Sequence, residues 1–215
     1  MSESRPTRQR IIDTALHEMA GSGLAGLSIG QLAKACSMSK SGLFAHFGGQ
    51  EALQCAVIDA AIEQFRLAVV EPARQQSGTL ARIEAVGVNW TGWLLRAPLR
   101  PCPILQSAFE APALTPEAAK RARQARTGWT GWVERLAKLA VHEGAFTAET
   151  DPVSFAFRFE AIGLGCQSWA VIQGRDEAER LTRDSFTALI DIAGTVAQVA
   201  ALARTGSELV RITVD

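Results

Sequence analysis

The residue types best suited to catalysis are spread thinly along this chain of 215 residues. Its three histidines, His17, His46 and His142, are scattered, with no nucleophile–base pattern and no glycine-rich phosphate loop near them. Glu110 and Glu160 fall near predicted aromatic faces, but carboxylates in such places more often pair with arginine or reach solvent. The sequence therefore predicts a protein that is not an enzyme and that needs no cofactor.

Cysteine chemistry is limited to one candidate. The four cysteines form no CxxC pair and have no histidine at metal-ligand spacing, so no metal site is predicted; they are Cys36, Cys55, Cys102 and Cys166. Cys102 lies between Pro101 and Pro103 and two residues after Arg100, in a stretch expected to be irregular and accessible. A nearby cation can make an accessible thiol reactive. Two interpretations stay open for Cys102: a reduced thiol that packs as a small hydrophobe, and a sensor of oxidants or electrophiles.

Residues 28–47 carry the most specific pattern, that of two short helices around a three-residue turn. Ser28 to Gln31 fits a capping box at the start of the first helix, and 37–39 form the turn. Seven apolar residues at helical spacing hold the helices together: Ile29, Leu32, Ala33, Cys36, Met38, Leu43 and Phe47. The outward face of the second helix is small or polar, with Lys40, Ser41, Gly42, Ala45 and His46. Such a helix fits the major groove of B-DNA, where its first turns reach base edges and nearby amides and hydroxyls bind phosphates.

The rest of the chain predicts an all-α protein that positions this segment. Strand patterns are nearly absent, there is no tyrosine, and alanine-rich stretches with a 3.6-residue period dominate. Caps and breakers indicate about nine helices. Their expected ranges are 8–20, 28–36, 40–46, 50–70, one that follows the polar joint 74–78 and ends near 97, 104–111, one capped by Thr115 that ends before Gly144, 151–174 and 176–203. The tail 204–215 has no clear partner.

Five short motifs follow one another within the first 53 residues. They are RIIDTA at 10–15, LSI at 27–29, LAKA at 32–35, MSKSGLF at 38–44, and HF at 46–47 with EAL at 51–53. In this order and spacing they resemble the TetR/AcrR family of transcriptional regulators. The resemblance implies an N-terminal three-helix helix-turn-helix domain for DNA over 1–49, with a connecting helix over about 50–70. It also implies a larger helical domain for effector binding and dimerisation over 50–203, followed by the tail 204–215.

The resemblance further implies which residues bind DNA. Ser28 caps its helix and touches a phosphate, Ala45 faces bases, and His46 binds a phosphate. The backbone amides of Gly49 and Gln50, at the start of the helix over 50–70, form an anion-binding helix end. The full predicted set is Ser28, Ser39, Lys40, Ser41, Gly42, Ala45, His46, Gly49 and Gln50.

Several residues depart from the family pattern and leave the site poor in charge. Ser37 stands where the family usually has glycine, and a left-handed backbone there would cost about 1 kcal/mol. Phe44 replaces a frequent tyrosine, and Gly42 replaces threonine or serine. The stretch Gly48-Gly49-Gln50 lacks the lysine that the family usually has at the start of its fourth helix. We therefore expect modest affinity unless a dimer doubles the contacts. Two recognition helices about 34–36 Å apart would then read a roughly palindromic double-stranded operator.

The resemblance places the homodimer interface on the last two long helices, and both are apolar over wide arcs. The predicted interface residues are Phe155, Ile162, Cys166, Phe186, Leu189, Ile190, Ala193 and Val196. Gly163 and Gly165 would let helices approach closely. The alternative, that some of these residues fill the protomer's own core, stays open.

A regulator of this kind needs a pocket whose occupation shifts the DNA-binding heads. Aromatic walls with few charges favour a small, largely apolar or aromatic effector. The predicted ligand-binding residues are Trp90, Trp93, Gln106, Phe109, Trp129, Trp132, Phe159 and Trp169. Each aromatic residue, taken alone, fits a core position better than a pocket wall.

The favoured function is therefore a ligand-responsive, DNA-binding transcriptional regulator, expected to be a repressor. The alternative is a helical small-molecule-binding protein or enzyme whose helix-turn-helix is incidental. An architectural nucleic-acid protein is disfavoured because 22 Lys and Arg residues balance 22 Asp and Glu residues. No apolar run reaches the roughly 18 residues of a membrane span, and the N-terminus lacks a signal-peptide pattern, so we expect a cytoplasmic protein without a membrane partner.

Overall fold

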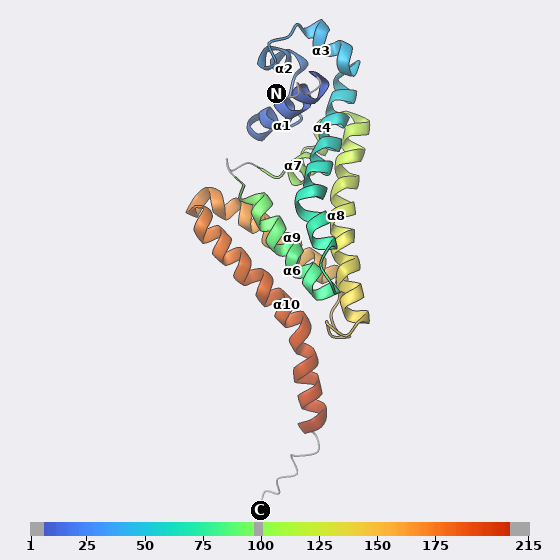
Figure 1. The fold of residues 1–215 in the computed structure, drawn as a ribbon, viewed down its shortest axis with the longest axis vertical. Coiled ribbons are helices and arrows are strands. Elements are labelled where there is room, and N and C mark those ends of the chain that lie inside the picture. The colour runs from blue at the N-terminus through green and yellow to red at the C-terminus, as the bar shows by residue number, and fades with distance from the viewer. Residues whose placement is uncertain (1–6, 97–100, 207–215) are drawn as a thin grey trace, which may run out of the picture. The chain divides into compact units, whose positions relative to one another are not determined.

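The computed structural model describes residues 7–96 and 101–206, with side chains in the last helix described as far as residue 194. The described residues form helices and no strands, which confirms the all-α prediction (Figure 1). The helices are α1 Thr7–Ser22, α2 Ile29–Ala35, α3 Lys40–Phe47, α4 Gln50–Phe65, α5 Glu71–Arg74, α6 Thr79–Leu94, α7 Pro103–Phe109, α8 Pro116–His142, α9 Pro152–Gln173 and α10 Arg175–Gly206. None of the helices in the described part of the chain combines the length and hydropathy that crossing a bilayer requires.

The helix expected over 50–70 is not one continuous α-helix. It ends as α4 at Phe65, continues as one π-helical turn, Arg66–Val70, and is followed by the four-residue α5. Pro72 lies in the first turn of α5, directly after the π-helical turn. The helical stretch therefore continues through the proline to Arg74, whereas the sequence predicted that it stops before the proline.

The chain divides into two compact units. The first comprises residues up to 68 together with 96–129, and the second comprises 69–95 together with the residues from 130 onward. Two long helical stretches, 50–70 and 116–142, are each shared between the units. The boundaries of these two units do not coincide with the predicted domain boundary at residue 49.

The first unit encloses one continuous apolar core under the short helices. Its buried residues come from α1 (Ile11, Ile12, Ala15, Met19), α2 (Leu32, Ala33), α3 (Leu43, Phe47), α4 (Leu53, Val57, Ile58) and the start of α8 (Ala118, Ala122). A helix as short as α3 is marginal alone, so burial of Leu43 and Phe47 is what holds it in place. The helix-turn-helix is therefore packed on its inner side and free on its outer side.

Side chains of α4 receive the start of α8. The buried Gln54 amide oxygen accepts bonds from the Thr115 backbone N–H at 3.0 Å and from the Thr115 hydroxyl at 2.9 Å. One turn earlier on α4, Glu51 accepts the backbone N–H of Glu117 at 3.3 Å. A salt bridge between Arg121 and Asp59 continues the contact. Thus α4 supplies acceptors for amides that a helix start leaves unsatisfied.

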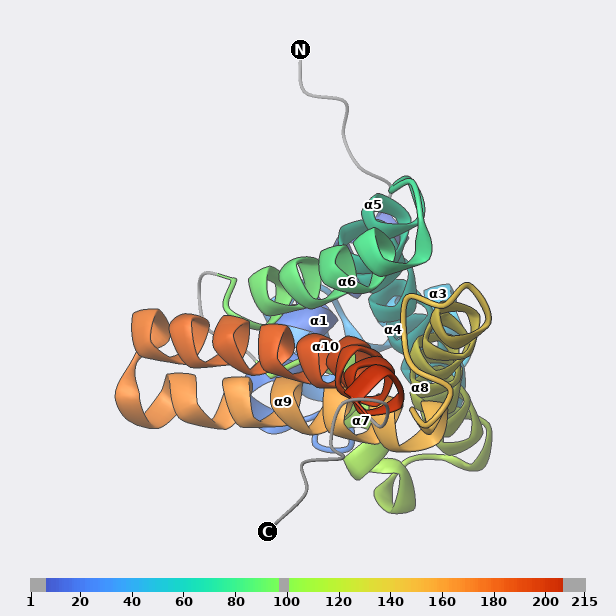
Figure 2. The same cartoon turned by 90° about the horizontal axis from the view of Figure 1, so that it is seen from below.

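The second unit is built around a chain of aromatic rings from several helices. Trp90 of α6 lies parallel to Phe159 of α9 with ring centroids 5.9 Å apart, and Phe159 contacts Phe186 of α10 at 4.4 Å. Gly163 makes the close approach possible, because a Cβ there would lie 2.2 Å from the Trp90 ring. Figure 2 shows α9 and α10 lying side by side with α6 next to them. Of the two glycines predicted to let helices approach closely, Gly163 does so inside this unit, whereas a Cβ at Gly165 would meet nothing within 4 Å.

Candidate nucleic-acid interface

The start of α2 has the hydrogen bonds that its sequence predicts. The Ser28 hydroxyl accepts the Gln31 backbone N–H at 3.1 Å, and the Gln31 side-chain oxygen accepts the Ser28 backbone N–H at 3.4 Å. The predicted capping box is therefore confirmed. It fixes the Ser28 side chain in an exposed position at the edge of the helix-turn-helix.

The turn between α2 and α3 confirms the left-handed backbone expected at Ser37, which has a φ of 54°. Two backbone bonds of the Schellman type close it, from Met38 N–H to Ala33 O at 2.8 Å and from Ser37 N–H to Lys34 O at 3.1 Å. These bonds offset the conformational cost of about 1 kcal/mol for a residue with a Cβ. The turn can thus be formed without the usual glycine.

The outer face of α3 is exposed as the helix-turn-helix prediction requires. Ser39 caps the helix by accepting the Gly42 backbone N–H at 3.0 Å. Lys40, Ser41, Ala45 and His46 are exposed, while Gly42 is half-buried because a Cβ there would lie 3.1 Å from the Ser39 hydroxyl oxygen. Phe44, which the sequence did not single out as a contact, is half exposed on the same short helix. The sequence did contain a signal for this exposure: Phe44 directly follows buried Leu43, and consecutive side chains on a helix point about 100° apart.

The start of α4 offers backbone amides with no side-chain cap. Gly49 occupies the N-cap position, and Gly48 before it has a left-handed φ of 76°. The Gln50 side chain is engaged elsewhere, because its Nε2 donates to the Leu27 carbonyl oxygen at 2.7 Å. The side-chain donor of Gln50 is therefore already used, and its predicted phosphate contact would have to come from its backbone N–H.

The charged side chains of residues 28–50 are all positive. Residues 28–50 contain Lys34 and Lys40 and no Asp or Glu, although the whole chain has a formal net charge of zero. Both lysines are exposed, and the Lys40 side chain crosses α2 at Gly30, where a Cβ would lie 3.0 Å from its Cε. A small exposed surface with cations and no carboxylate is suited to a polyanion.

The predicted thiol sensor is not accessible. Cys102 is 1% exposed, because it stands at the N-cap of α7 with Pro103 as the first helical residue and turns toward the interior of its unit. The expectation of an accessible thiol is therefore wrong. Burial also raises the pKa of the Cys166 and Cys55 thiols, which disfavours their reactive thiolate forms. No metal-binding cluster of His, Cys, Asp or Glu exists among the described residues.

The residues predicted to line one effector pocket fall in two units. Trp90 and Phe159 are packed against each other in the core of the second unit. Trp93, Trp132 and Trp169 belong to the same unit. In the first unit, buried Trp129 meets Phe65 edge to face at 4.9 Å, and Gln106 donates to the Met19 carbonyl oxygen at 3.1 Å.

Two of the residues predicted to line the effector pocket are exposed. Phe109 is 63% exposed and lies under the Arg126 guanidinium at 4.8 Å. Trp169 is 43% exposed on α9. Both rings face solvent. Helical periodicity identifies an apolar residue but does not say which neighbour, if any, covers it, so this exposure could not be predicted from the sequence.

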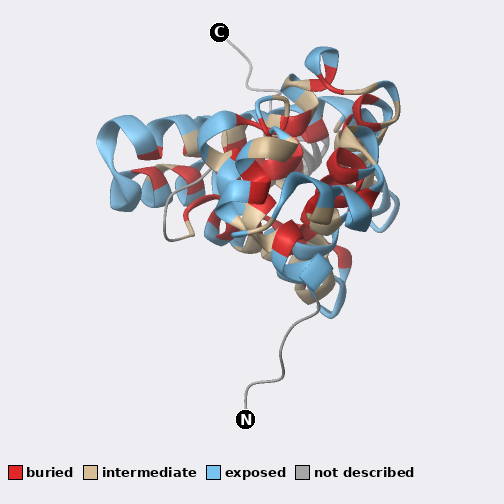
Figure 3. Cartoon of the chain, turned by 90° about the horizontal axis from the view of Figure 1, so that it is seen from above, coloured by how far each residue is buried: buried red, intermediate tan, exposed pale blue. Residues whose placement is uncertain are grey.

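Most of the predicted dimer residues belong to the protomer's own core. Phe155, Cys166, Phe186, Leu189 and Ala193 are buried within the second unit, Ile162 and Ile190 are half-buried, and the Val196 side chain lies outside the described part. For these five residues the alternative left open by the sequence holds, since they fill the protomer's own core, where α9 and α10 pack these faces on each other and on α6. Figure 3 shows buried positions on the inner sides of the helices and exposed positions on their outer sides.

A different stripe of α9 is apolar and exposed. Val153, Phe157 and Val171 are at least 60% exposed, and Leu164 between them is half-buried. At 3.6 residues per turn these four positions fall within about 40° of one another around the helix. On α10, Leu181, Ser185, Ala188 and Ile192 form a comparable outward row. These eight residues are called the outer stripe below.

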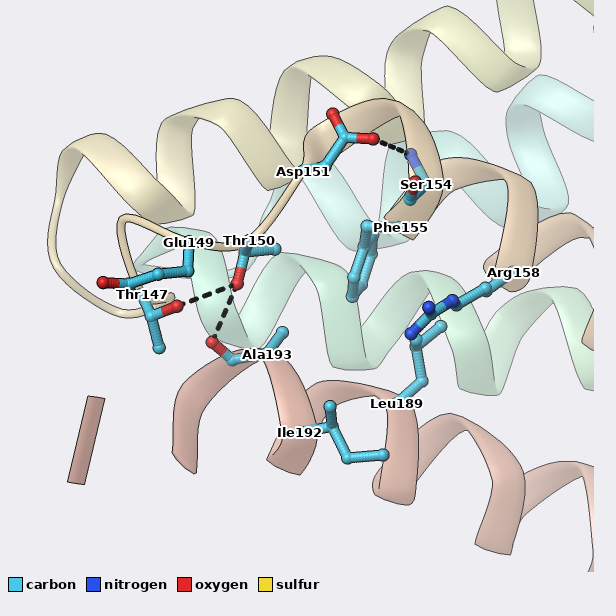
Figure 4. Close-up of a pocket in the computed structure, with 10 residues that line it drawn as sticks. All are labelled: Thr147, Glu149, Thr150, Asp151, Ser154, Phe155, Arg158, Leu189, Ile192 and Ala193. Atoms are coloured by element: carbon cyan, nitrogen blue, oxygen red, sulfur yellow. Dashed lines mark hydrogen bonds between the residues drawn. The ribbon is translucent and has the colours of Figure 1, made fainter. Parts of the chain in front are cut away.

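A recess of about 220 Å³ adjoins the outer stripe at the start of α9. Figure 4 shows its polar edge, where the Thr150 hydroxyl donates to the Ala193 carbonyl oxygen at 3.1 Å, and its apolar side around Phe155, Leu189 and Ile192. Arg158 extends from α9 toward Leu189. The recess therefore combines an apolar floor with one cation, Arg158, and two carboxylates, Glu149 and Asp151.

Comparisons with known proteins agree with the helix-turn-helix geometry described above for residues 28–50, which are called the tip. Residues 11–57 match the family model for "bacterial regulatory proteins, tetR family", and residues 79–186 match that for "tetracyclin repressor-like, C-terminal domain". A search of curated protein sequences found no match.

Solved structures with the same fold include a TetR transcriptional regulator from Chloroflexus aurantiacus, with 26% identity and a TM-score of 0.72 over 86% of this chain and 92% of that one. A second is AibR in complex with isovaleryl coenzyme A and operator DNA, with 21% identity and a TM-score of 0.71 over 88% and 98% of the two chains. A third is a TetR-family regulator from Cytophaga hutchinsonii, with 20% identity and a TM-score of 0.72 over 90% and 98%.

Proposed function

The chain belongs to the TetR family of bacterial regulatory proteins, a family of ligand-responsive DNA-binding regulators, and from this premise we propose that it is a repressor released from its operator by a small, largely apolar or aromatic effector. The observation that supports DNA binding most strongly is the tip formed by residues 28–50. It combines an exposed α3 with small polar side chains, an uncapped α4 start, two lysines and no carboxylate. Catalysis is not part of the proposal, since members of this family act by binding.

Salt dependence tests the DNA-binding step directly. Phosphate contacts release counterions, so the affinity for a labelled duplex should fall steeply as salt is added, with a slope of about −0.9 per phosphate contacted. Fluorescence anisotropy over a salt series measures that slope. An affinity that is weak and unaffected by salt would contradict the proposal and favour a helical binding protein with an incidental helix-turn-helix.

We propose that a second copy of the chain covers the outer stripe. Large apolar side chains such as Phe157 and Val171, 72% and 74% exposed on one helix, are costly in water and are suited to a protein partner. A twofold axis would bring the same stripe from both copies together, so one surface serves both partners. The mass of the purified protein by light scattering tests this, with twice the chain mass expected.

We propose that the effector binds within the region 79–186, and that Trp90, Trp93, Trp132 and Phe159, which all belong to the second unit, are the candidate contacts. All five tryptophans of the chain lie in this region, so intrinsic fluorescence reports on it and not on the DNA-binding tip. A panel of hydrophobic and aromatic compounds, with an acyl coenzyme A included because AibR was solved with one, should contain a compound that shifts the emission and releases DNA. A compound that shifts the emission without releasing DNA would not be the effector.

The division of labour that we propose keeps DNA binding at residues 1–49 and effector binding and dimerisation at 50–203. A cytoplasmic location follows as part of the same proposal, because a regulator must meet its operator.

A further inference from the structure

The junction between α3 and α4 has no basic residue of its own beyond His46. The residues that follow α3 are Gly48, Gly49 and Gln50, and the Gln50 side-chain donor is bonded to Leu27. The two lysines of the tip lie on α2 and at the start of α3, and Lys40 is directed across Gly30. A phosphate at this junction would therefore meet amides but would need a cation from elsewhere in the fold.

Arg8, in the first turn of α1, brings a cation to this junction. Its guanidinium carbon lies 4.9 Å from the centroid of the Phe47 ring, at the last residue of α3. Arg8 is exposed, and it forms no ion pair with any described residue. Stacking on a ring that is itself mostly buried orients the planar group, so less side-chain freedom is lost when it binds an anion.

The carboxylates that share a groove with this arginine are bonded to other partners. Arg8 lies at the edge of a groove lined also by Glu51, Asp59 and Glu117. Glu51 accepts the backbone N–H of Glu117, and both Asp59 and Glu117 bond Arg121. Because Glu51 and Asp59 bind residues of α8 and Glu117 pairs with Arg121 on its own helix, the Arg8 guanidinium stays available for a ligand.

We propose that Arg8 is a DNA-contacting residue that binds a phosphate beside the α3–α4 junction. The inference rests on the proposed DNA-binding function and adds a contact from α1 to the set on α2, α3 and α4. Its chemistry is that of a guanidinium held over an aromatic ring, whose N–H donors can bind phosphate oxygens. Such a contact raises affinity for any sequence, because phosphates carry no base information.

The test compares the full-length chain with R8A, R8K and R183A on one labelled duplex of mixed sequence, about 30 base pairs long so that two half-sites fit. R183A is the matched control, since Arg183 is an exposed arginine on α10 and its removal changes the charge equally. Anisotropy over a salt series should show R8A losing about 0.9 from the slope per protomer. R8K should retain most of that slope and R183A all of it, and melting curves confirm that each variant is folded.

The outcomes separate the two levels of the proposal. If the wild-type chain shows no salt-dependent binding, DNA binding itself fails and the role of Arg8 fails with it. If the wild-type chain binds and R8A keeps the wild-type slope, only the role of Arg8 is overturned. A loss of slope in R183A equal to that in R8A would also overturn it, since a general charge effect would then explain both.

Discussion

The exposed faces of α3 and α9 differ in kind, although both helices bury their opposite face in a core. On α3 the exposed residues are a lysine, a serine, an alanine and a histidine, with one phenylalanine. On α9 the exposed stripe holds Val153, Phe157 and Val171. Small polar residues lose little by facing water and can approach a phosphate backbone closely, whereas large apolar residues gain when a protein partner covers them.

This contrast teaches that exposure must be read together with side-chain chemistry. The α3 face can stay in water until DNA arrives, and its contacts are electrostatic and sensitive to salt. The α9 face needs a permanent cover, and its contacts should be insensitive to salt. Substitutions on the two faces should therefore alter different measurements, and substitutions at helix starts should alter stability alone.

The largest effect is expected for F157D. A carboxylate in the outer stripe would appear twice in a twofold interface, and an unpaired buried charge costs about 3–5 kcal/mol. Light scattering should show a mass of one chain where the wild type shows two, and DNA affinity should fall with it. F157L is the control, since it keeps the apolar surface and should remain dimeric. A dimeric F157D would remove the outer stripe from the interface.

The next effect is expected for A45E. Ala45 is exposed on α3, so a glutamate should be tolerated by the fold but should repel phosphates. We expect affinity for duplex DNA to fall about 100-fold, or ~2.8 kcal/mol, with unchanged mass and melting temperature. A45S serves as the control. If A45E bound DNA like the wild type, the α3 face would not be the interface.

A smaller effect, confined to stability, is expected for Q54A. The buried Gln54 oxygen accepts two bonds from Thr115, so its removal leaves a backbone N–H and a hydroxyl without that acceptor. Unfolding by urea should show a loss of about 1–2 kcal/mol. Binding to DNA at low temperature, where the variant is still folded, should be close to that of the wild type. A large loss of affinity would instead show that the contact between α4 and the start of α8 affects DNA binding by the tip.

The smallest effect concerns pH and the start of α9. Hydrogen bonds from Ser154, and then from Val153, hold the pKa of the Asp151 carboxyl below its ordinary value in the folded chain. The ionised form therefore favours folding above the unfolded-state pKa near 4, and this stabilisation is lost as the pH falls through the folded-state pKa.

The measurement is the melting temperature of the wild type and of D151N, which keeps a capping oxygen without the charge. The wild type should melt slightly higher at neutral pH, and the difference should shrink on acidification below about pH 4. A difference that is independent of pH would show that the charge of Asp151 contributes nothing.

Local sequence was sufficient for the helix-turn-helix. The capping box at Ser28, the left-handed Ser37 and the limits of α3 depend on residues within a few positions of one another, so their prediction needed no tertiary information. The family motifs lie in the same segment. For this reason the most specific functional prediction was also the one best determined by neighbouring residues.

The faces of the long helices could not be predicted in the same way. Phe155 is buried and Phe157 is exposed, although both are phenylalanines two positions apart on α9. Which arc meets α10 depends on contacts between residues far apart in the chain. The burial of Cys102 and the contact of Arg8 with Phe47 have the same cause, since each joins distant segments.

Footprinting of the purified protein on bacterial DNA tests most directly whether a dimer reads the duplex with its α3 helices. A paired copy that sets two α3 helices into successive major grooves should protect a roughly palindromic site, with half-site centres about 10–10.5 base pairs apart or a multiple of that spacing. A45E should abolish the footprint. Protection of one unrepeated half-site, or a footprint that A45E leaves unchanged, would contradict the claim that the exposed α3 face of a dimer reads the DNA.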